Sequence, residues 1–244
     1  MKIFGFNLSQ ENKFINITCN IILVLIVGVV FSLSVFSPVI SVGYVPTQKA
    51  IYYGNKQNKN ISLMVNVYWG SEYLKDMLQI FKDNKVKTTF FVGGMWVAKN
   101  NNLLLEILND GHELGNHGYN HKDHAKLTAK QNQEEIHTTY QLVESLTGVK
   151  LNLFAPPSGS YNQNVLSVAG NLGYKTIMWS KDTIDWRDKD ENLIFERATK
   201  NSENGDLILM HPTKYTVKAL PRIINNLVEK GFKLTTVSEN IAGL

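Results

Sequence analysis

The chain has 244 residues, of which 43% are hydrophobic and 19% are charged, and its formal net charge is +4. No basic stripe interleaved with aromatic residues accompanies this charge, so the composition argues against nucleic acid as a partner. The single cysteine, Cys19, excludes an intrachain disulfide. These features indicate an ordinary globular protein, apart from one long apolar segment near the N-terminus.

That segment lies in a stretch from Phe14 to Gln48 that contains no charged side chain. Residues 21–40 are almost wholly apolar and are long enough to cross a hydrocarbon layer of ~30 Å as a helix. A cleaved signal sequence is the alternative, but the apolar stretch exceeds the usual core of ~7 to 15 residues and no Ala-x-Ala site follows it. The pattern therefore predicts a transmembrane or signal-anchor helix after a cytoplasmic tail at residues 1–20. We expect a single-pass protein of the cell membrane whose large domain lies outside the cytoplasm.

Residues 41–60 contain Gly43, Pro46 and Gly54 and are interpreted as a linker, which places the folded domain at residues 61–244. Strand-like and helix-like stretches alternate from Ile61 onward, which is typical of a mostly parallel α/β fold. About seven strand–helix units in this length favour a distorted (β/α) barrel over an open doubly wound sheet. The predicted strands are 61–67, 88–93, 112–117, 151–155, 175–180, 206–211 and 233–237, and the predicted helices are 72–85, 103–109, 128–146, 164–172, 192–200 and 219–230.

Unusual polar clusters occur at or just after the ends of the predicted strands. His117 and His121 are four residues apart, a spacing at which two imidazoles can face one cation, although such a pair alone is weak evidence for a metal site. In a parallel barrel the carboxyl ends of the strands share one rim, so we expect five loops to converge on one mouth. The five clusters contain Asn66, the histidine pair, the run Pro156 to Gly159, the run Asp182 to Trp186, and His211.

At these positions the chain resembles the polysaccharide deacetylase family, whose domain is called the NodB homology domain and forms carbohydrate esterase family 4. The resemblance extends from about Ile61 to Val237. The segment Asn66 to Gly70 is similar to that of the family branch found in spore-forming bacteria, the sporulation-type branch. It is carried by Thr89 to Phe91, Gly111 to His117 with His121, Phe154 to Gly159, Asp185 with Trp186, and Leu207 to Pro212.

The resemblance implies hydrolysis of carbon–nitrogen bonds other than peptide bonds, with zinc or a similar divalent metal held by one aspartate and two histidines. It identifies His117 and His121 as the metal ligands and His211 as the general acid. Asp185 would orient His211, and the metal-bound water would attack the acetamide. The predicted substrate contacts are Trp186 and Leu209 around the acetyl methyl, the backbone N–H of Ser158 beside Pro157, and Tyr68 and Trp69, which either stack on a sugar or seal the barrel.

Four positions depart from the family pattern. Asn66 and Val67 stand where an active member has two aspartates, the base and the third metal ligand, and Ala155 stands where an arginine orients the base. Gly118 replaces a residue with a hydroxyl that steadies the histidine loop. An amide cannot accept the proton of water, and a guanidinium without its carboxylate is costly in a partly buried site, so Asn66 and Ala155 look like a compensated pair.

Two functions therefore compete. The first is a deacetylase of N-acetylated cell-wall or spore polysaccharide, similar to peptidoglycan or chitin, with a rearranged site. In that site the oxygen of Asn66 or Asp123 completes the metal shell, and another carboxylate or a metal-bound hydroxide replaces the base. His124 is a further candidate to reach the metal. The second is a catalytically degenerate, non-enzymatic module of the cell envelope that binds carbohydrate or acts as a scaffold. The family favours the first, and the positions Asn66, Val67 and Ala155 favour the second. In either case we expect a monomer held at the membrane by its N-terminal helix.

Overall fold

The computed structural model describes residues 17, 19–28 and 48–244. The chain divides into two units, Met1–Tyr44 and Val45–Leu244. In the first unit residues 19–28 are helical, and none of the helices in the described parts of the chain is long and apolar enough to cross a membrane. The remainder of the predicted span, residues 29–40, lies outside the described residues, so the membrane helix stays a prediction.

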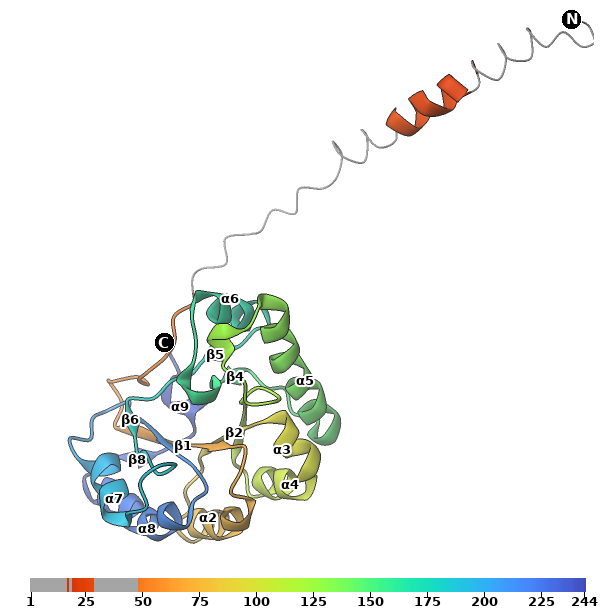
Figure 1. Ribbon diagram of the computed structural model, residues 1–244. Helices are drawn as coiled ribbons and strands as arrows, with labels where there is room; N and C mark the ends of the chain where they lie inside the picture. The colour runs from red at the N-terminus through yellow and green to blue at the C-terminus, as the bar shows by residue number, and fades with distance from the viewer. Residues whose placement is uncertain (1–16, 18, 29–47) are drawn as a thin grey trace, which may run out of the picture. The chain divides into compact units, whose positions relative to one another are not determined.

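The second unit is built on a curled sheet whose strand pairs are parallel (Figure 1). The strand order is β5-β4-β3-β2-β1-β7-β6, and β8 pairs with β1. This half-barrel with surrounding helices confirms the predicted α/β class. It is also consistent with the predicted distorted barrel, although the sheet is a curled half-barrel. The strands are β1 (Asn60–Val67), β2 (Thr89–Val92), β3 (Glu113–Asn116), β4 (Leu153–Phe154), β5 (Lys175–Thr176), β6 (Lys181–Asp182), β7 (Leu207–Met210) and β8 (Lys233–Leu234).

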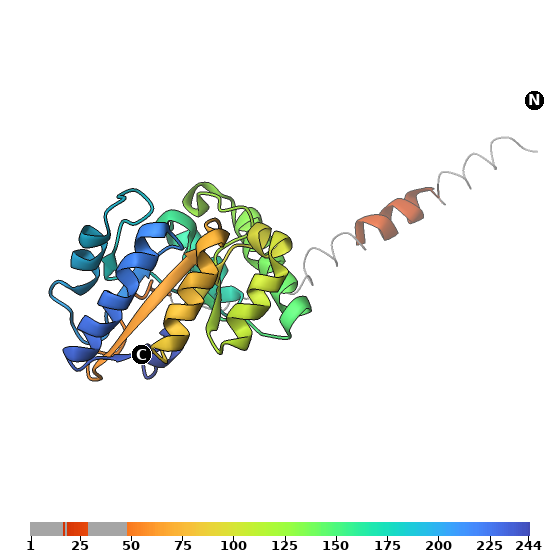
Figure 2. The same cartoon turned by 90° about the horizontal axis from the view of Figure 1, so that it is seen from below.

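Most of the helices lie along the outside of the sheet, as the view from below shows (Figure 2). The longest, α5, begins with a capping box between Thr128 and Gln131 and ends at Gly148, whose φ is 71°. The helices are α2 (Ser71–Asp83), α3 (Gly94–Lys99), α4 (Asn101–Asn109), α5 (Ala129–Thr147), α6 (Gln163–Asn171), α7 (Glu191–Thr199), α8 (Lys214–Glu229) and α9 (Val237–Asn240), with 3-10 turns η1 (His124–Lys126) and η2 (Pro157–Gly159).

Several predicted element boundaries were wrong, each for a local reason. Helix α8 starts at Lys214 rather than Ala219, because the hydroxyl of Thr213 caps it by accepting from the N–H of Thr216. The last predicted strand, 233–237, is only the two-residue β8, since Thr236 caps α9 instead. The predicted strand 175–180 is likewise shortened to β5, and the sequence did not predict α3, β6 or α9.

Alternating side chains of β1 face two different environments. Leu63, Val65 and Val67 are buried in the main hydrophobic core, which contains the apolar faces of the outer helices. Met64 belongs to a second, smaller core on the inner side of the sheet, and Asn66 follows it toward the cavity described below. This alternation decides which residues at the end of β1 can reach the functional site.

A short segment before β1 lies across the opening between the two ends of the strand order, and we call residues 51–54 the strap. Ile51 forms a parallel bridge with Ile177, just after β5, and Tyr53 forms an antiparallel bridge with Asp206, just before β7. Backbone hydrogen bonds of 2.7 Å join Ile51 to Met178 and Gly54 to Gly205. The folded domain thus includes part of the stretch interpreted as a linker, 41–60, whose first seven residues lie outside the described region.

Candidate functional site

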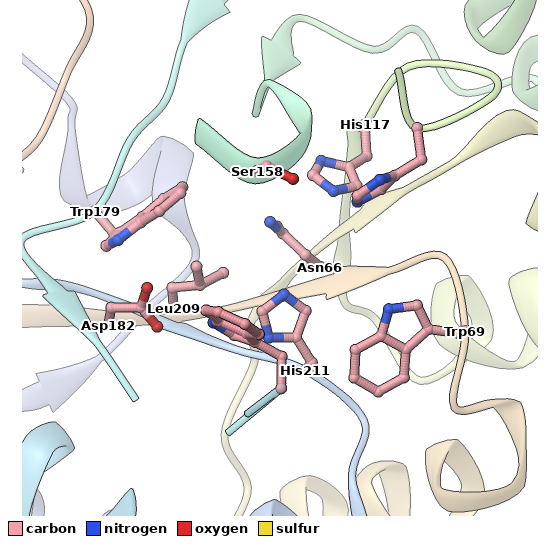
Figure 3. A pocket seen from close by; sticks show the side chains of 10 residues that line it. Asn66, Trp69, His117, Ser158, Trp179, Asp182, Leu209 and His211 are labelled. Carbon is pink, nitrogen blue, oxygen red and sulfur yellow. The ribbon is translucent and has the colours of Figure 1, made fainter. Parts of the chain in front are cut away.

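A cavity of about 560 Å³ opens where the carboxyl ends of the parallel strands meet (Figure 3). All five of the polar clusters that the sequence predicted at one mouth contribute side chains to it. The predicted convergence is therefore present in the structure. The cavity is lined by Asn66, Trp69, His117, His121, Ser158, Trp179, Asp182, Trp186, Leu209 and His211.

His117 and His121 lie beside one another in this cavity, with ring centroids 5.1 Å apart. The Nδ1 of His117 lies 2.7 Å from the carbonyl oxygen of Ala155. Because a carbonyl only accepts, Nδ1 carries the proton and Nε2 keeps a free lone pair. Burial lowers the pKa of His121 and lowers that of His117 well below its usual value. Both imidazoles are therefore neutral at pH 7, the form that binds a metal.

The loop between these histidines is held by Glu135, a buried carboxylate of α5 that the sequence motifs did not identify. Glu135 accepts hydrogen bonds from the backbone N–H groups of Tyr119 and Asn120, at 2.9 and 2.6 Å, and forms a 2.9 Å ion pair with Lys122. Burial raises the pKa of Glu135, but the bonds from Asn120 and Lys122 outweigh it and the pKa is lowered overall. The sequence did contain a signal for the burial of Glu135, because this residue precedes Ile136 on the buried side of the predicted helix.

Gly118 is required by the backbone and by a close neighbour. Its φ is +69°, and a Cβ at this position would lie 2.7 Å from Nε2 of His124. The hydroxyl residue expected from the resemblance would therefore displace His124. His124 is fully buried but does not line the cavity, and Asp123 is turned away to Ser160 and Lys126. Neither residue joins the histidine pair as a ligand.

The structure contains the hydrogen-bonded pair of His211 and Asp185, which the resemblance assigns to the general acid. The Nδ1 of His211 lies 2.8 Å from one carboxylate oxygen of Asp185, and the other oxygen accepts from the backbone N–H of His211 at 2.7 Å and from the hydroxyl of Thr216 at 2.6 Å. Asp185 is buried and does not itself line the cavity. This arrangement fixes the imidazole and leaves its Nε2 toward the cavity, as the resemblance implied.

The positions of the base and the third ligand lack the required groups. Asn66 is 4% exposed, and its Oδ1 is buried without a hydrogen-bond partner among the described residues. Val67 is fully buried in the main core, on the side of β1 that faces away from the cavity, and Ala155 is also fully buried. The inner end of β1 thus presents one amide and no carboxylate.

These residues do not fit a catalytic divalent metal. Catalytic zinc takes three protein ligands and keeps one open position. In the region that the structure describes, no group of three His, Cys, Asp or Glu side chains is placed to hold a metal ion. Two neutral imidazoles and the unpartnered oxygen of Asn66 supply no negative charge, so this set of side chains supports no catalytic step through a metal.

The predicted substrate contacts separate into two groups. Trp69, Trp186, Leu209 and Ser158 line the cavity. Pro157 instead lies buried at the start of η2, and Tyr68 packs on His121 with ring centroids 4.9 Å apart. Tyr68 and Pro157 therefore contribute as supports of cavity residues.

Two lining residues, Trp179 and Asp182, had no predicted role. Asp182 lies in β6, opposite Leu209 of β7, and its Oδ1 accepts from the backbone N–H of Ile184 at 2.8 Å. Burial raises the pKa of Asp182. Its position at a strand end was the available signal, but the pattern from Asp182 to Asp185 also fits a helix cap.

Residues 53–177 match the family model described as polysaccharide deacetylase. YlxY of Bacillus subtilis (strain 168) is 42% identical over 189 residues, which cover 78% of this chain and 59% of that protein, so the chain spans less than two thirds of its length. The peptidoglycan-N-acetylmuramic acid deacetylase PdaA of the same organism is 30% identical over 195 residues, covering 78% of this chain and 74% of PdaA.

Solved structures show the same fold. The crystal structure of BA3943, a CE4 family pseudoenzyme from Bacillus anthracis, has a TM-score of 0.77 at 36% identity and covers 79% of this chain and 69% of its own. A mutant of BA3943 described as having restored enzymatic activity also has a TM-score of 0.77, at 35% identity, with 79% and 71% coverage. From its sequence, fold and cavity, the chain belongs to the polysaccharide deacetylase family.

Proposed function

We propose that this domain is a non-catalytic member of its family that binds cell-wall polysaccharide without removing acetyl groups. The observation that carries this proposal is Asn66, whose amide occupies the place of the catalytic base. An amide has no appreciable basicity, so it cannot take a proton from attacking water. Removal of a catalytic base leaves little beyond residual rate enhancement.

The neighbouring positions support the same conclusion. Val67 points into the apolar core and Ala155 adds no charge to the cavity wall. Three separate components of the reaction, namely the base, the third metal ligand and the orienting cation, are thus missing together. BA3943, which shares the fold at 36% identity, is itself described as a pseudoenzyme.

The remaining cavity is suited to sugar. Trp69 and Trp186 are 43% and 56% exposed, which is unusual for such large aromatic side chains unless they contact a ligand. Indole faces pack against the apolar faces of pyranose rings, while polar lining atoms pair with hydroxyls. PdaA and other relatives act on peptidoglycan, as their names state, and this supports a cell-wall glycan as the ligand.

A second candidate, a deacetylase with a rearranged site, is favoured by one observation. The pair of His211 and Asp185 is intact, and His117 and His121 are neutral with nitrogen lone pairs available. Binding alone does not require a general acid. Acetate release from N-acetylglucosamine oligomers, measured with zinc present, distinguishes the two candidates.

For the non-catalytic module we expect the purified chain to sediment with insoluble cell-wall polysaccharide and to release no acetate above the background of the His117→Ala variant. Acetate release that is abolished by His117→Ala but unaffected by Asn66→Ala would establish the rearranged enzyme instead. Failure to sediment with the wall, together with no acetate release, would reject both functions.

We also propose that residues 21–40 hold the domain at the outer face of the cell membrane, close to the wall. The support is their apolar composition and length. The chain should then remain with membranes after extraction with alkaline carbonate. Recovery of a soluble chain whose N-terminus lies between Ser37 and Gln48 would indicate a cleaved signal sequence.

A further inference from the structure

The charge inside the cavity differs from what a deacetylase needs. Asp182 is the acid among the lining residues, and no lysine or arginine lines the cavity in the described part of the chain. With Ala155 at the arginine position, no lysine, arginine or three-ligand metal set of the described residues lies in the cavity to pair with the carboxylate of Asp182.

Asp182 brings a negatively charged hydrogen-bond acceptor into the cavity, beside lining residues that carry N–H and O–H donors, such as Trp179 and Ser158. One oxygen of Asp182 is occupied by the N–H of Ile184, which leaves the other available to a ligand. The Oδ1 of Asn66 is buried out of reach of a ligand, and Figure 3 shows the amide nitrogen of Asn66 directed into the cavity. The Nε2 atom of His117 is a second acceptor, because the Nδ1 of that ring is protonated. A ligand that pairs with Asp182 must therefore supply a donor.

Aromatic faces surround the same space. Trp69, Trp179 and Trp186 all line the cavity, and Figure 3 shows Trp179 and Asp182 on one side of it, beside Leu209. The negative face of an indole attracts a cation, and tryptophan is the strongest aromatic partner in this interaction. A carboxylate next to indole rings is a site for a positively charged group attached to an apolar ring face.

We propose that the cavity binds a hexosamine unit with a free, protonated amine, paired with Asp182, in preference to the N-acetylated unit. An ammonium group offers three donors and no acceptor, so it can form a charge-assisted hydrogen bond with Asp182. An acetamide offers one donor and brings a carbonyl oxygen that must lose its water near a carboxylate. A charge-assisted hydrogen bond is roughly twice as strong as a neutral one. The inference rests on the proposed non-catalytic sugar binding, and it makes the domain a reader of polysaccharide that is already deacetylated.

The test is calorimetric titration of the full chain, in mild detergent, with two probes: a β-1,4-linked glucosamine tetramer and the matching N-acetylglucosamine tetramer. We expect the glucosamine tetramer to bind at least tenfold more tightly. The chain carries a formal net charge of +4, so its overall charge repels a cationic ligand. A preference for the glucosamine tetramer must therefore come from the local site. Raising the ionic strength should weaken the glucosamine tetramer more than its N-acetylated counterpart.

Asp182→Asn should remove at least tenfold of the affinity for the glucosamine tetramer. The asparagine retains an oxygen for the N–H of Ile184, so the turn is preserved. Glu229→Gln removes the same charge from an exposed position at the end of α8 and should change nothing. If Asp182→Asn fails to fold, two measurements on the unchanged chain still test the inference. They are its preference for the glucosamine tetramer and the salt dependence of that binding.

Equal or tighter binding of the N-acetylated tetramer would overturn this inference while leaving sugar binding intact. Undiminished affinity in a folded Asp182→Asn variant would overturn it too. If neither tetramer binds, the proposed sugar-binding function fails together with the inference.

Discussion

The indole of Trp69 lies over the imidazole of His211, with ring centroids 5.5 Å apart and planes 8° from parallel. The Nδ1 of His211 lies 2.8 Å from a carboxylate oxygen of Asp185. The edge of the imidazole is therefore held by a carboxylate, and its face is covered by an aromatic ring. Trp69 is nevertheless 43% exposed, and its outer surface remains available to a ligand. The two residues therefore form one wall of the cavity.

We expect Trp69→Ala to weaken binding of cell-wall oligosaccharide by roughly three- to tenfold, because an aromatic contact contributes about 0.5–1.5 kcal/mol beyond area burial. The free energy of unfolding should fall modestly, since more than half of the side chain is covered and it stacks on His211. Calorimetric titration measures the affinity, and urea denaturation measures the stability. Val228→Ala, an exposed apolar residue on α8, is the matched control. Unchanged affinity would show that this wall does not contact the sugar.

The compensation between Asn66 and Ala155 predicts that these two positions are coupled in stability. Ala155→Arg alone places a guanidinium at a fully buried position and should lower the free energy of unfolding by about 3 kcal/mol or more. Combined with Asn66→Asp, the loss should shrink by at least about 1 kcal/mol, because the carboxylate pairs with the guanidinium. Urea denaturation of the four proteins gives the coupling energy. Simple additivity would show that the two replacements are unrelated.

Restoring the catalytic groups should restore function in steps. Asn66→Asp adds negative charge to the cavity that holds His117 and His121, and Val67→Asp adds a carboxylate that must turn away from the core to reach them, so we expect tighter zinc binding in equilibrium dialysis. Val67 points into the apolar core, so its replacement should also lower stability by a few kcal/mol until the carboxylate turns toward the cavity. Acetate release from an N-acetylglucosamine oligomer should require Ala155→Arg as a third change. Equal acetate release from the double and triple variants would contradict the orienting role assigned to the arginine.

The stability of the domain should fall in mildly acidic solution. Burial lowers the pKa of His112 from 6.5 to about 4, so below pH 6.5 the unfolded chain binds a proton that the folded chain refuses. The contribution of His112 is complete above pH 6.5 and is lost as the pH falls toward 4, at a cost of about 3 kcal/mol. Denaturation midpoints between pH 4 and 7 measure this dependence. This pH dependence of stability should be smaller in the His112→Asn variant. It should be unchanged in the control variant His137→Asn, because the side chain of His137 is exposed.

The strap predicts where a stable fragment must begin. A fragment from Gln48 to Leu244 keeps the bridges of Ile51 and Tyr53 and should unfold cooperatively. A fragment that starts at Ile61 loses both bridges, together with the backbone bonds of Gly54, and we expect it to be less stable by several kcal/mol. Thermal unfolding of the two fragments provides the comparison. Equal stability would mean that residues 48–60 form a linker, as the sequence alone suggested.

The sequence identified those parts of the fold that depend on local signals. The cap at Thr128 and the stop at Gly148 define α5, and the apolar run before Asn66 defines β1. Strand β6 has only two residues and exists because Lys181 and Asp182 pair with β7, a contact that no local pattern encodes. The other two-residue strands, β4, β5 and β8, lie within predicted strands that were too long, and the one-turn helix α9 was missed although Thr236 caps it.

The candidate site shows a similar division. His117, His121 and His211 were located from their motifs, since strand ends converge in any parallel barrel. The direction in which Val67 points was not predictable, because it depends on which face of β1 meets the cavity. The part played by Glu135 depends on α5 lying against the histidine loop, and that of Asp182 depends on the register of β6 with Leu209.

Because the sheet does not close on itself, β5 and β6 would be free edges that offer unpaired backbone groups to any passing strand. Such edges are templates for intermolecular pairing and aggregation. The strap covers one of these edges, because Ile51 bridges to Ile177 just after β5, while its other bridge joins Tyr53 to Asp206 just before β7. The segment that leads into the domain therefore shields the β5 side of the sheet against pairing with another molecule.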